Sequence, residues 1–153
     1  KTAALLAAAA SVGAILGGAG EPAIAALRGF GGNLGIAFQA IDDILGIWGD
    51  PGVTGKPAAN DLRQRKKTIP VAHALGSIGG EELGHLLSNG ELTEDGLRRG
   101  LALIESSGGR EWTLDLAERH FHDASAALET ASLAPEAVEE LRELARFVVG
   151  RDF

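Results

Sequence analysis

The sequence contains no cysteine, no methionine and no tyrosine. The absence of cysteine excludes disulfides, thiolate catalysis and cysteine-ligated zinc or iron–sulfur sites. Aromatic residues make up 5% of the chain, too few for the stacking platforms that bind bases or sugars. Basic residues are outnumbered, since the formal net charge is −7, whereas a surface that neutralises nucleic-acid phosphates needs an excess of Lys and Arg. We therefore expect no binding to nucleic acid.

Long runs of large hydrophobic residues are also missing. The uncharged stretch 2–20 follows Lys1 and suggests a signal peptide or a membrane span, but most of it is Ala and Gly. We interpret it as a buried, tightly packed helix of a soluble protein, and expect a cytoplasmic location without a membrane span. Because the chain begins at Lys1-Thr2 and lacks methionine, we expect it to be part of a longer or processed polypeptide.

Helical periodicity runs along nearly the whole chain, and 45% of its 153 residues are hydrophobic, enough for a substantial core. No apolar/polar alternation typical of strands is present. We predict a single all-α domain over residues 1–153. The helices that we expect are Thr2–Leu16, one from Pro22 through the run 34–48 with a kink at Gly31-Gly32, Thr68–Leu75, Glu81–Leu87, one from the N-cap Thr93 to Ile104, a long amphipathic helix through Leu114 and Leu128, and a last helix that begins at Pro135 with Val138, Leu141, Ala145 and Val148 inward.

One long loop interrupts this pattern. Glycine and proline recur through residues 46–57, which predicts irregular structure that contains no helix. Loops of this length inside compact domains are usually functional or disordered. We expect residues 49–67 to be mobile without a ligand, because no apolar periodicity packs them down.

The segment 34–48 carries the strongest chemical signal. At 100° per residue its side chains are apolar nearly all round, which is typical of a helix inside a protein. The polar exceptions Gln39, Asp42 and Asp43 fall on one arc. Two adjacent buried carboxylates are costly unless a cation meets them, and no Lys or Arg lies within a turn. Salt bridges to another helix are one explanation. A hard divalent cation is favoured, and Mg²⁺ with retained waters suits one or two carboxylates.

A group of basic residues follows this acidic pair. They are Lys56, Arg63, Arg65, Lys66 and Lys67. A solvated patch or a nucleic-acid contact is the ordinary interpretation. Next to an Asp-Asp pair in an acidic chain, a compact polyphosphate ligand accounts for both signs of charge. Lys1-Thr2 at a helix start offers a further cation and backbone amides to the same ligand.

Other kinds of chemistry find little support. The spacing of His120 and His122 prevents them from sharing a helix face, while His73 and His85 are isolated, so all four are expected to be structural or solvated. No Ser-His-Asp arrangement and no dinucleotide or Walker fingerprint is present.

Several short motifs, taken in order, resemble the polyprenyl synthetase family of trans-isoprenyl diphosphate synthases. They are Phe38-Gln39-Ala40-Ile41-Asp42-Asp43-Ile44-Leu45, Trp48-Gly49-Asp50, Gly55-Lys56, Asp61 and Lys66-Lys67-Thr68-Ile69-Pro70, with Lys1-Thr2 at the start and Arg151-Asp152-Phe153 at the end. The family's first aspartate-rich motif is missing. The chain therefore resembles the C-terminal half of such an enzyme, an all-α helical bundle of the isoprenoid synthase type, and its composition is compatible with the actinobacterial geranylgeranyl diphosphate synthases.

The resemblance implies condensation of isopentenyl diphosphate with an allylic diphosphate, through Mg²⁺-assisted ionisation, condensation and proton loss. By motif match, Asp42 and Asp43 would bind Mg²⁺, with Gln39 in support. The groups implied to bind the allylic diphosphate or to stabilise the allylic cation are Lys1, Thr2, Gln39, Lys56, Lys66 and Lys67; Lys1, Thr2, Gln39 and Lys56 among them would be catalytic. A homodimer is implied as well.

One position departs from the family pattern. The pattern places another Asp four residues after Asp42, where this chain has Gly46, which weakens the implied second metal site. Asp50 cannot replace it, because on a continued helix it would lie about 12 Å from Asp42. Two alternatives stay open: a class I terpene cyclase, and a non-catalytic helical subunit of a prenyl synthase.

Overall fold

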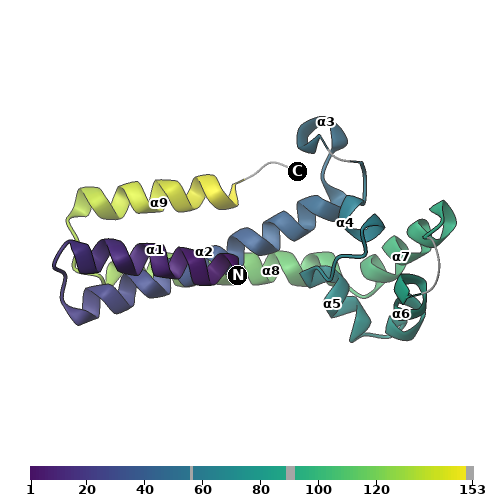
Figure 1. Cartoon of the computed structure of the whole chain (residues 1–153), viewed down its shortest axis with the longest axis horizontal. Coiled ribbons are helices and arrows are strands. Elements are labelled where there is room, and N and C mark those ends of the chain that lie inside the picture. Colours follow the sequence, from purple (N-terminus) through teal and green to yellow (C-terminus); the bar gives the residue numbers. More distant parts are fainter. Residues whose placement is uncertain (56, 89–91, 151–153) are drawn as a thin grey trace. The chain divides into compact units, whose positions relative to one another are not determined.

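The computed structural model describes residues 1–55, 57–88 and 92–150, and within these ranges it contains helices and turns but no β-strand (Figure 1). The all-α prediction is confirmed. The helices are α1 (Thr2–Leu16), α2 (Glu21–Trp48), α3 (Pro51–Thr54), α4 (Asn60–Arg63), α5 (Ile69–Leu75), α6 (Gly80–Ser88), α7 (Glu94–Ser106), α8 (Gly109–Glu129) and α9 (Pro135–Val149).

The helices form two compact units. Unit 1 comprises Lys1–Ile41 and the described part of 116–152, and unit 2 comprises the described part of 42–115. Both boundaries fall inside helices, one within α2 and one within α8.

Unit 1 is built from α1, α9 and the parts of α2 and α8 that belong to it. In Figure 1, α1 and α9 run alongside each other. The buried core residues of this unit include Leu27, Phe30, Leu34, Ala124, Leu128 and Ala145. The inward-facing residues expected on α9 are confirmed, because Val138, Leu141 and Val148 pack against the same cluster.

Glycine lets α1 approach α2 closely in unit 1. A β-carbon at Gly31 would lie 2.7 Å from the carbonyl carbon of Leu6, and one at Gly35 would lie 3.0 Å from the backbone nitrogen of Ala3. Such distances leave no room for a side chain. Gly31 therefore serves close packing, whereas a β-carbon at Gly32 would make only an ordinary contact. The helix α2 is continuous through both glycines, and the kink expected there stays a prediction.

The expectation that α1 is buried is wrong. Only Ser11 and Ala14 on this helix are buried, whereas Leu5 is 71% exposed and Leu16 is 83% exposed. The small residues of α1 produce close contact with α2 on one face, but a helix of this composition does not need to be covered on all sides.

Unit 2 packs α5, α6 and α7 around a core that α4 completes. Its fully buried side chains include Leu62, Val71, Leu83 and Ile104. Thr93 is the N-cap of α7, as predicted, and its hydroxyl accepts a hydrogen bond from the Gly96 N–H at 3.2 Å.

The prediction of a helix-free loop over residues 46–57 is wrong, because α2 continues through Gly46 to Trp48 and α3 follows at Pro51–Thr54. The mobility expected over residues 49–67 stays a prediction. Asp50 caps α3, where Pro51 is suited to the first helical turn because it needs no amide donor. Leu62 on α4 is fully buried and Ala59 is 2% exposed, so two apolar side chains anchor the segment to the core of unit 2. Two apolar residues, Ala59 and Leu62, are too few to produce a helical or strand period, so the sequence did not reveal this packing.

No helix in the described ranges is both long and apolar enough to cross a membrane.

Candidate functional site

The acidic face of α2 lies in unit 2 and begins with Asp42 and Asp43. Asp43 is 7% exposed, whereas Asp42 is only partly buried, so the expectation that both carboxylates are buried holds for Asp43 alone. Asp43 Oδ2 accepts a hydrogen bond of 2.8 Å from the backbone N–H of Ile69, the first residue of α5. This bond satisfies one amide at the start of that helix and fixes the orientation of the carboxylate.

Lys66 supplies the nearest cation. Its ammonium lies 2.5 Å from Oδ1 of Asp61, and its backbone N–H donates to the Asp61 carbonyl at 2.9 Å. The hydrogen bond to Asp61 raises the pKa of Lys66 above its ordinary value of 10.5, and the charges of Asp61, Asp42 and Asp43 add to this rise against the opposing effect of burial. Asp42 and Asp43 thus add to the effect of the ion pair between Lys66 and Asp61 on the pKa of Lys66.

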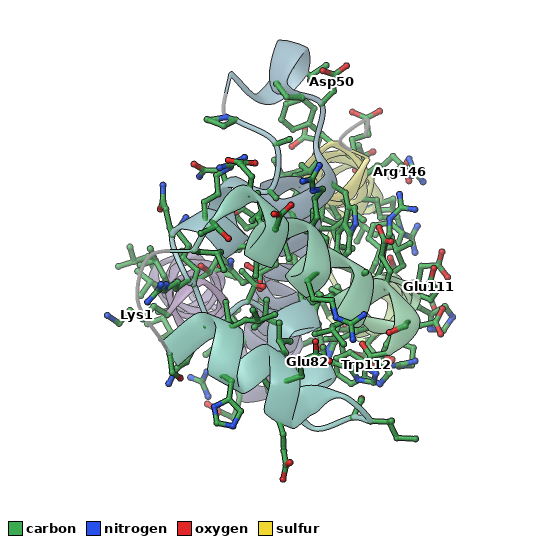
Figure 2. The ribbon with its side chains drawn as sticks, turned by 90° about the vertical axis from the view of Figure 1, so that its right-hand side faces the viewer. Lys1, Asp50, Glu82, Glu111, Trp112 and Arg146 are labelled. Atoms are coloured by element: carbon green, nitrogen blue, oxygen red, sulfur yellow. The ribbon has the colours of Figure 1, made fainter. Side chains whose placement is uncertain are left out.

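Thr2 and Gln39, both in unit 1, are also brought together. The Thr2 hydroxyl donates to the Gln39 side-chain oxygen at 2.9 Å, across a sequence separation of 37 residues. Lys1, which precedes Thr2 in the sequence, is exposed, and Figure 2 shows its side chain at the surface. An apolar groove of about 440 Å³ adjoins this end of α1, and its lining consists of Lys1, Thr2, Leu5, Leu6, Leu34, Phe38, Leu144 and Val148.

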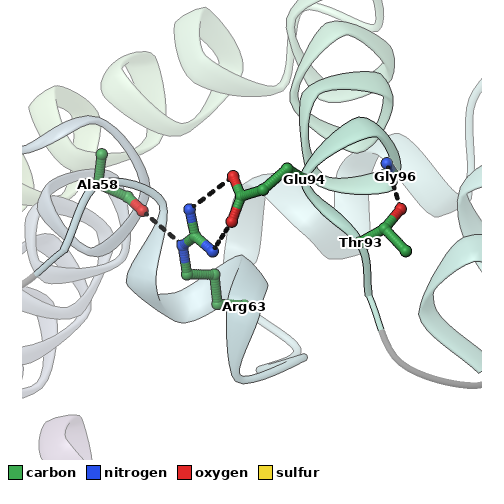
Figure 3. A network of polar contacts seen from close by, with 5 residues as sticks. All are labelled: Ala58, Arg63, Thr93, Glu94 and Gly96. Atoms are coloured by element: carbon green, nitrogen blue, oxygen red, sulfur yellow. Dashed lines mark hydrogen bonds and ion pairs between the residues drawn. The ribbon is translucent and has the colours of Figure 1, made fainter.

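Arg63 has a structural partner and does not belong with the phosphate-binding candidates. Its guanidinium forms a bidentate ion pair with Glu94 at 2.6 and 3.0 Å, and its Nε donates to the Ala58 carbonyl at 3.2 Å (Figure 3). The hydrogen bond to Arg63 lowers the pKa of Glu94 below 4.5. This pair links α4 to the first turn of α7, where a carboxylate is favoured by the helix dipole.

The remaining candidates are spread more widely. Lys67 is exposed, while Lys56 lies outside the described residues. Asp50 is exposed (Figure 2). It accepts a hydrogen bond of 2.7 Å from the Gly52 N–H and caps α3, so it does not replace the missing carboxylate on α2.

The two histidines with described contacts are structural, as expected. His73 stacks on Trp112 with ring centroids 4.9 Å apart, and its Nε2 lies 3.1 Å from the Ser107 carbonyl. His120 Nδ1 contacts the side-chain oxygen of Asn33 at 2.8 Å.

The sequence assigns no function to two further buried polar residues near the acidic face. Asp61 is 5% exposed and holds Lys66, although the motif match gave it no function. Thr68 is 4% exposed, and within the described residues its hydroxyl has no hydrogen-bond partner. The spacing of five residues between Asp61 and Lys66 was the only sequence signal for their ion pair. Nothing in the sequence marks the Thr68 hydroxyl.

The donor chemistry around α2 fits Mg²⁺. Over residues 1–55, 57–88 and 92–150, no three His, Asp or Glu side chains gather into a group that could hold a metal. Mg²⁺ is usually bound by one or two carboxylates together with waters and substrate phosphates, so such a group is not required.

The described residues form an all-helical fold with paired aspartates on one helix and a lysine-bearing segment after it. This arrangement is typical of a helical protein that binds a divalent cation together with a phosphate group. A sequence model described as polyprenyl synthetase matches residues 1–104. The chain belongs to the polyprenyl synthetase family.

Named relatives agree with this family. The chain is 42% identical to a (2E,6E)-farnesyl diphosphate synthase of Mycobacterium bovis over 99% of this chain and 44% of that protein. It is 43% identical to a geranylgeranyl diphosphate synthase of Mycobacterium tuberculosis over 90% of this chain and 40% of that protein. The chain thus spans less than half the length of these relatives.

Solved structures show the same fold. A polyprenyl synthetase from Streptomyces coelicolor A3(2) superposes with a TM-score of 0.90 at 46% identity, over 97% of this chain and 47% of that one. A geranylgeranyl pyrophosphate synthase from Corynebacterium glutamicum, described as complexed with isoprenyl diphosphate and magnesium, gives a TM-score of 0.79 at 30% identity, over 92% of this chain and 41% of that one.

Proposed function

We propose that the protein is a prenyltransferase that condenses isopentenyl diphosphate with an allylic diphosphate, and that this chain contributes the binding site for the allylic diphosphate. The observation that carries the proposal is the position of Lys66, which pairs with Asp61 within electrostatic range of Asp42 and Asp43. A diphosphate with a divalent counter-ion needs cationic and anionic protein groups side by side, and this arrangement offers both. Membership of the polyprenyl synthetase family supports the same function.

The metal-binding function is assigned to the acidic face of α2. Asp42, the more accessible of the two carboxylates, would hold Mg²⁺, and Asp43 would support it from the position that its hydrogen bond to Ile69 fixes. When bound, Mg²⁺ neutralises charge on the diphosphate leaving group. The relative from Corynebacterium glutamicum, described with magnesium and isoprenyl diphosphate, favours this choice of ion.

The other candidates act on the substrate itself. Lys1, Lys56, Lys66 and Lys67 would bind the allylic diphosphate and stabilise the negative charge that grows on it as its carbon–oxygen bond breaks and the electron pair leaves with diphosphate. Thr2 and Gln39, already joined by a hydrogen bond, would direct oxygen dipoles at the resulting allylic cation. The groove beside Thr2 is lined by aliphatic side chains and suits the hydrocarbon chain.

The second substrate, isopentenyl diphosphate, would react with the allylic cation. The double bond of isopentenyl diphosphate would supply the electron pair for the new carbon–carbon bond, and a proton would leave the product for the departed diphosphate. This step needs groups that bind isopentenyl diphosphate, which we place in the part of the family's length that this chain does not span. A homodimer is proposed by the same similarity.

The test is Asp42→Asn in the full-length protein, with Asp115→Asn as a matched control on an exposed position. The protein is incubated with isopentenyl diphosphate, an allylic diphosphate and Mg²⁺, and the products are separated by chain length. We expect elongated prenyl diphosphate from the parent and the control, and turnover lower by several orders of magnitude in Asp42→Asn, with unchanged helical circular dichroism.

The other outcomes discriminate between the alternatives. Cyclic hydrocarbon products would indicate a terpene cyclase, and no turnover of any allylic diphosphate would indicate a non-catalytic subunit. Either result would overturn the proposal. Parental turnover in Asp42→Asn would overturn the assigned metal-binding function.

A further inference from the structure

The side chain of Arg63 joins three parts of unit 2. Its Nη1 and Nη2 donate to the two carboxylate oxygens of Glu94 at 2.6 and 3.0 Å, and its Nε donates to the Ala58 carbonyl at 3.2 Å (Figure 3). A guanidinium that meets a carboxylate through two N–H groups has a fixed orientation relative to it. One side chain therefore links the residue before α4, α4 itself and the start of α7.

Glu94 belongs to a well-anchored part of α7. It is the first residue of that helix and follows the N-cap Thr93, whose hydroxyl accepts the Gly96 N–H at 3.2 Å. Further along the helix, Leu97 and Ile104 are buried in the core of unit 2. The helix dipole also favours a carboxylate in the first turn. The ion pair thus connects α4 to a helix start whose movement would disturb the core.

The segment 58–66 depends on such connections, because its own helix is short. α4 is a single turn of four residues, and helices of this length are not stable alone in water. Ala59 and Arg65, which flank this turn, have φ values of 53° and 52°, in the left-handed region that is unfavourable for residues other than glycine. Such conformations persist where the surroundings enforce them. Contacts with the rest of unit 2 must therefore hold the segment in place.

The position of Lys66 follows from the position of α4. Its backbone N–H donates to the Asp61 carbonyl at 2.9 Å, and its ammonium lies 2.5 Å from Oδ1 of the same residue. At the other end of the segment, the Ala59 N–H donates to the Ile47 carbonyl of α2 at 3.1 Å. The last residue of α4 is Arg63, three positions before Lys66. Its ion pair therefore holds the end of α4 from which Lys66 extends.

We propose that Arg63 and Glu94 are positioning residues for the diphosphate site: their ion pair fixes the end of α4 on α7, so that Lys66 lies where it can bind the allylic diphosphate. The inference rests on the proposed function. Neither residue contacts the substrate, because Glu94 acts through Arg63 and Arg63 acts through α4. The two side chains are 39% and 68% exposed, so their pair adds little to the free energy of unfolding. Its loss should therefore be measurable mainly as weaker binding.

The experiment compares two bidentate Arg–Glu pairs in the full-length protein. Glu94→Gln breaks the pair with Arg63, and the control Glu82→Gln breaks the pair with Arg99, which joins α6 to α7 at 2.6 and 2.7 Å and involves no residue of α4. Calorimetry measures binding of inorganic diphosphate with Mg²⁺, and steady-state kinetics gives KM for each substrate. Glu94→Gln should weaken diphosphate binding and raise KM for the allylic diphosphate about three- to fivefold, the upper range for an exposed ion pair. KM for isopentenyl diphosphate, kcat and all values for Glu82→Gln should stay at the parental level.

A double-mutant cycle separates positioning from direct binding by Arg63. If the two residues act through their pair, Arg63→Gln should weaken diphosphate binding in the parent and have no further effect in Glu94→Gln. If Arg63 instead bound the diphosphate itself, Glu94→Gln would free its charge and tighten binding, and Arg63→Gln would weaken binding in both backgrounds.

The inference alone would be overturned by that pattern, by parental binding in Glu94→Gln, or by an equal loss in Glu82→Gln. Failure of the proposed function looks different, because the parent itself would then bind no diphosphate with Mg²⁺ and would form no elongated product. Circular dichroism at the assay temperature verifies that each variant is folded.

Discussion

The carboxylate of Asp43 on α2 accepts the backbone N–H of Ile69, the first residue of α5, over 2.8 Å. Thr68 is the N-cap residue of α5 by position, yet its side chain makes no capping hydrogen bond. Asp43 therefore does for α5 what an N-cap side chain normally does, across 26 residues of sequence. Neighbouring aspartates thus have different surroundings: Asp43 is tied to the fold, and Asp42 is the more accessible of the two.

This division predicts opposite effects of two alanine substitutions. Asp43→Ala should lower the free energy of unfolding by about 1–3 kcal/mol, because the partly buried Ile69 N–H loses its acceptor. Asp42→Ala should change it much less while abolishing Mg²⁺-dependent binding of diphosphate. Urea unfolding followed by circular dichroism measures the first effect and calorimetry the second. Equal stability of the two variants would contradict the division.

Lys66 should discriminate between the two substrates. Lys66→Ala should raise KM for the allylic diphosphate about tenfold, as expected for loss of one charge-assisted contact in a partly exposed position, and should leave KM for isopentenyl diphosphate nearly unchanged. Lys56→Ala is expected to act in the same direction. Steady-state kinetics with each substrate varied in turn, and Arg98→Ala as an exposed control, check this. Equal effects on both substrates would place the lysine outside the allylic site.

Adjacent glycines on α2 should respond oppositely to alanine. Gly31→Ala introduces a β-carbon 2.7 Å from the Leu6 backbone, and overpacking of this kind typically costs about 1–3 kcal/mol of stability. Gly32→Ala places its β-carbon 3.8 Å from the Ala7 side chain, an ordinary contact, so the better helix propensity of alanine should stabilise by up to about 1 kcal/mol. Thermal unfolding of both variants gives the comparison, and a stabilised Gly31→Ala would refute close packing of α1 on α2.

The Arg63–Glu94 pair should give stability a specific pH dependence. The hydrogen bond to Arg63 lowers the pKa of Glu94 below its ordinary value of 4.5. A group with a lowered folded-state pKa contributes stability above its unfolded-state pKa and loses that contribution as pH falls through the folded-state value. Glu94→Gln should therefore melt at a lower temperature than the parent at pH 7, and the difference should shrink as the pH falls below 4.5 and vanish once it lies below the lowered folded-state pKa of Glu94.

Glu118→Gln is the control for this pair, because Glu118 is exposed on α8. It should melt as the parent does across the same pH range. A difference between Glu94→Gln and the parent that persists at strongly acidic pH would mean that packing, and not charge, links α4 to α7.

The helical class and most helix positions could be predicted from the sequence, because the period of the apolar residues is local information. It also placed Gln39 and Asp42 on one face of α2, since that follows from helical spacing. The group of lysines that follows the acidic pair could also be recognised from the sequence, because both groups lie within short stretches of the chain.

Which of these groups contact one another depends on how the helices pack. The hydrogen bond from Thr2 to Gln39, the capping of α5 by Asp43 and the pairing of Arg63 with Glu94 join residues 37, 26 and 31 positions apart. Contacts at such separations depend on how helices pack, which no periodicity encodes. The same holds for Gly46: the family pattern has a carboxylate at this position, whereas in this fold the carboxylate of Asp61 occupies the volume that a side chain there would need.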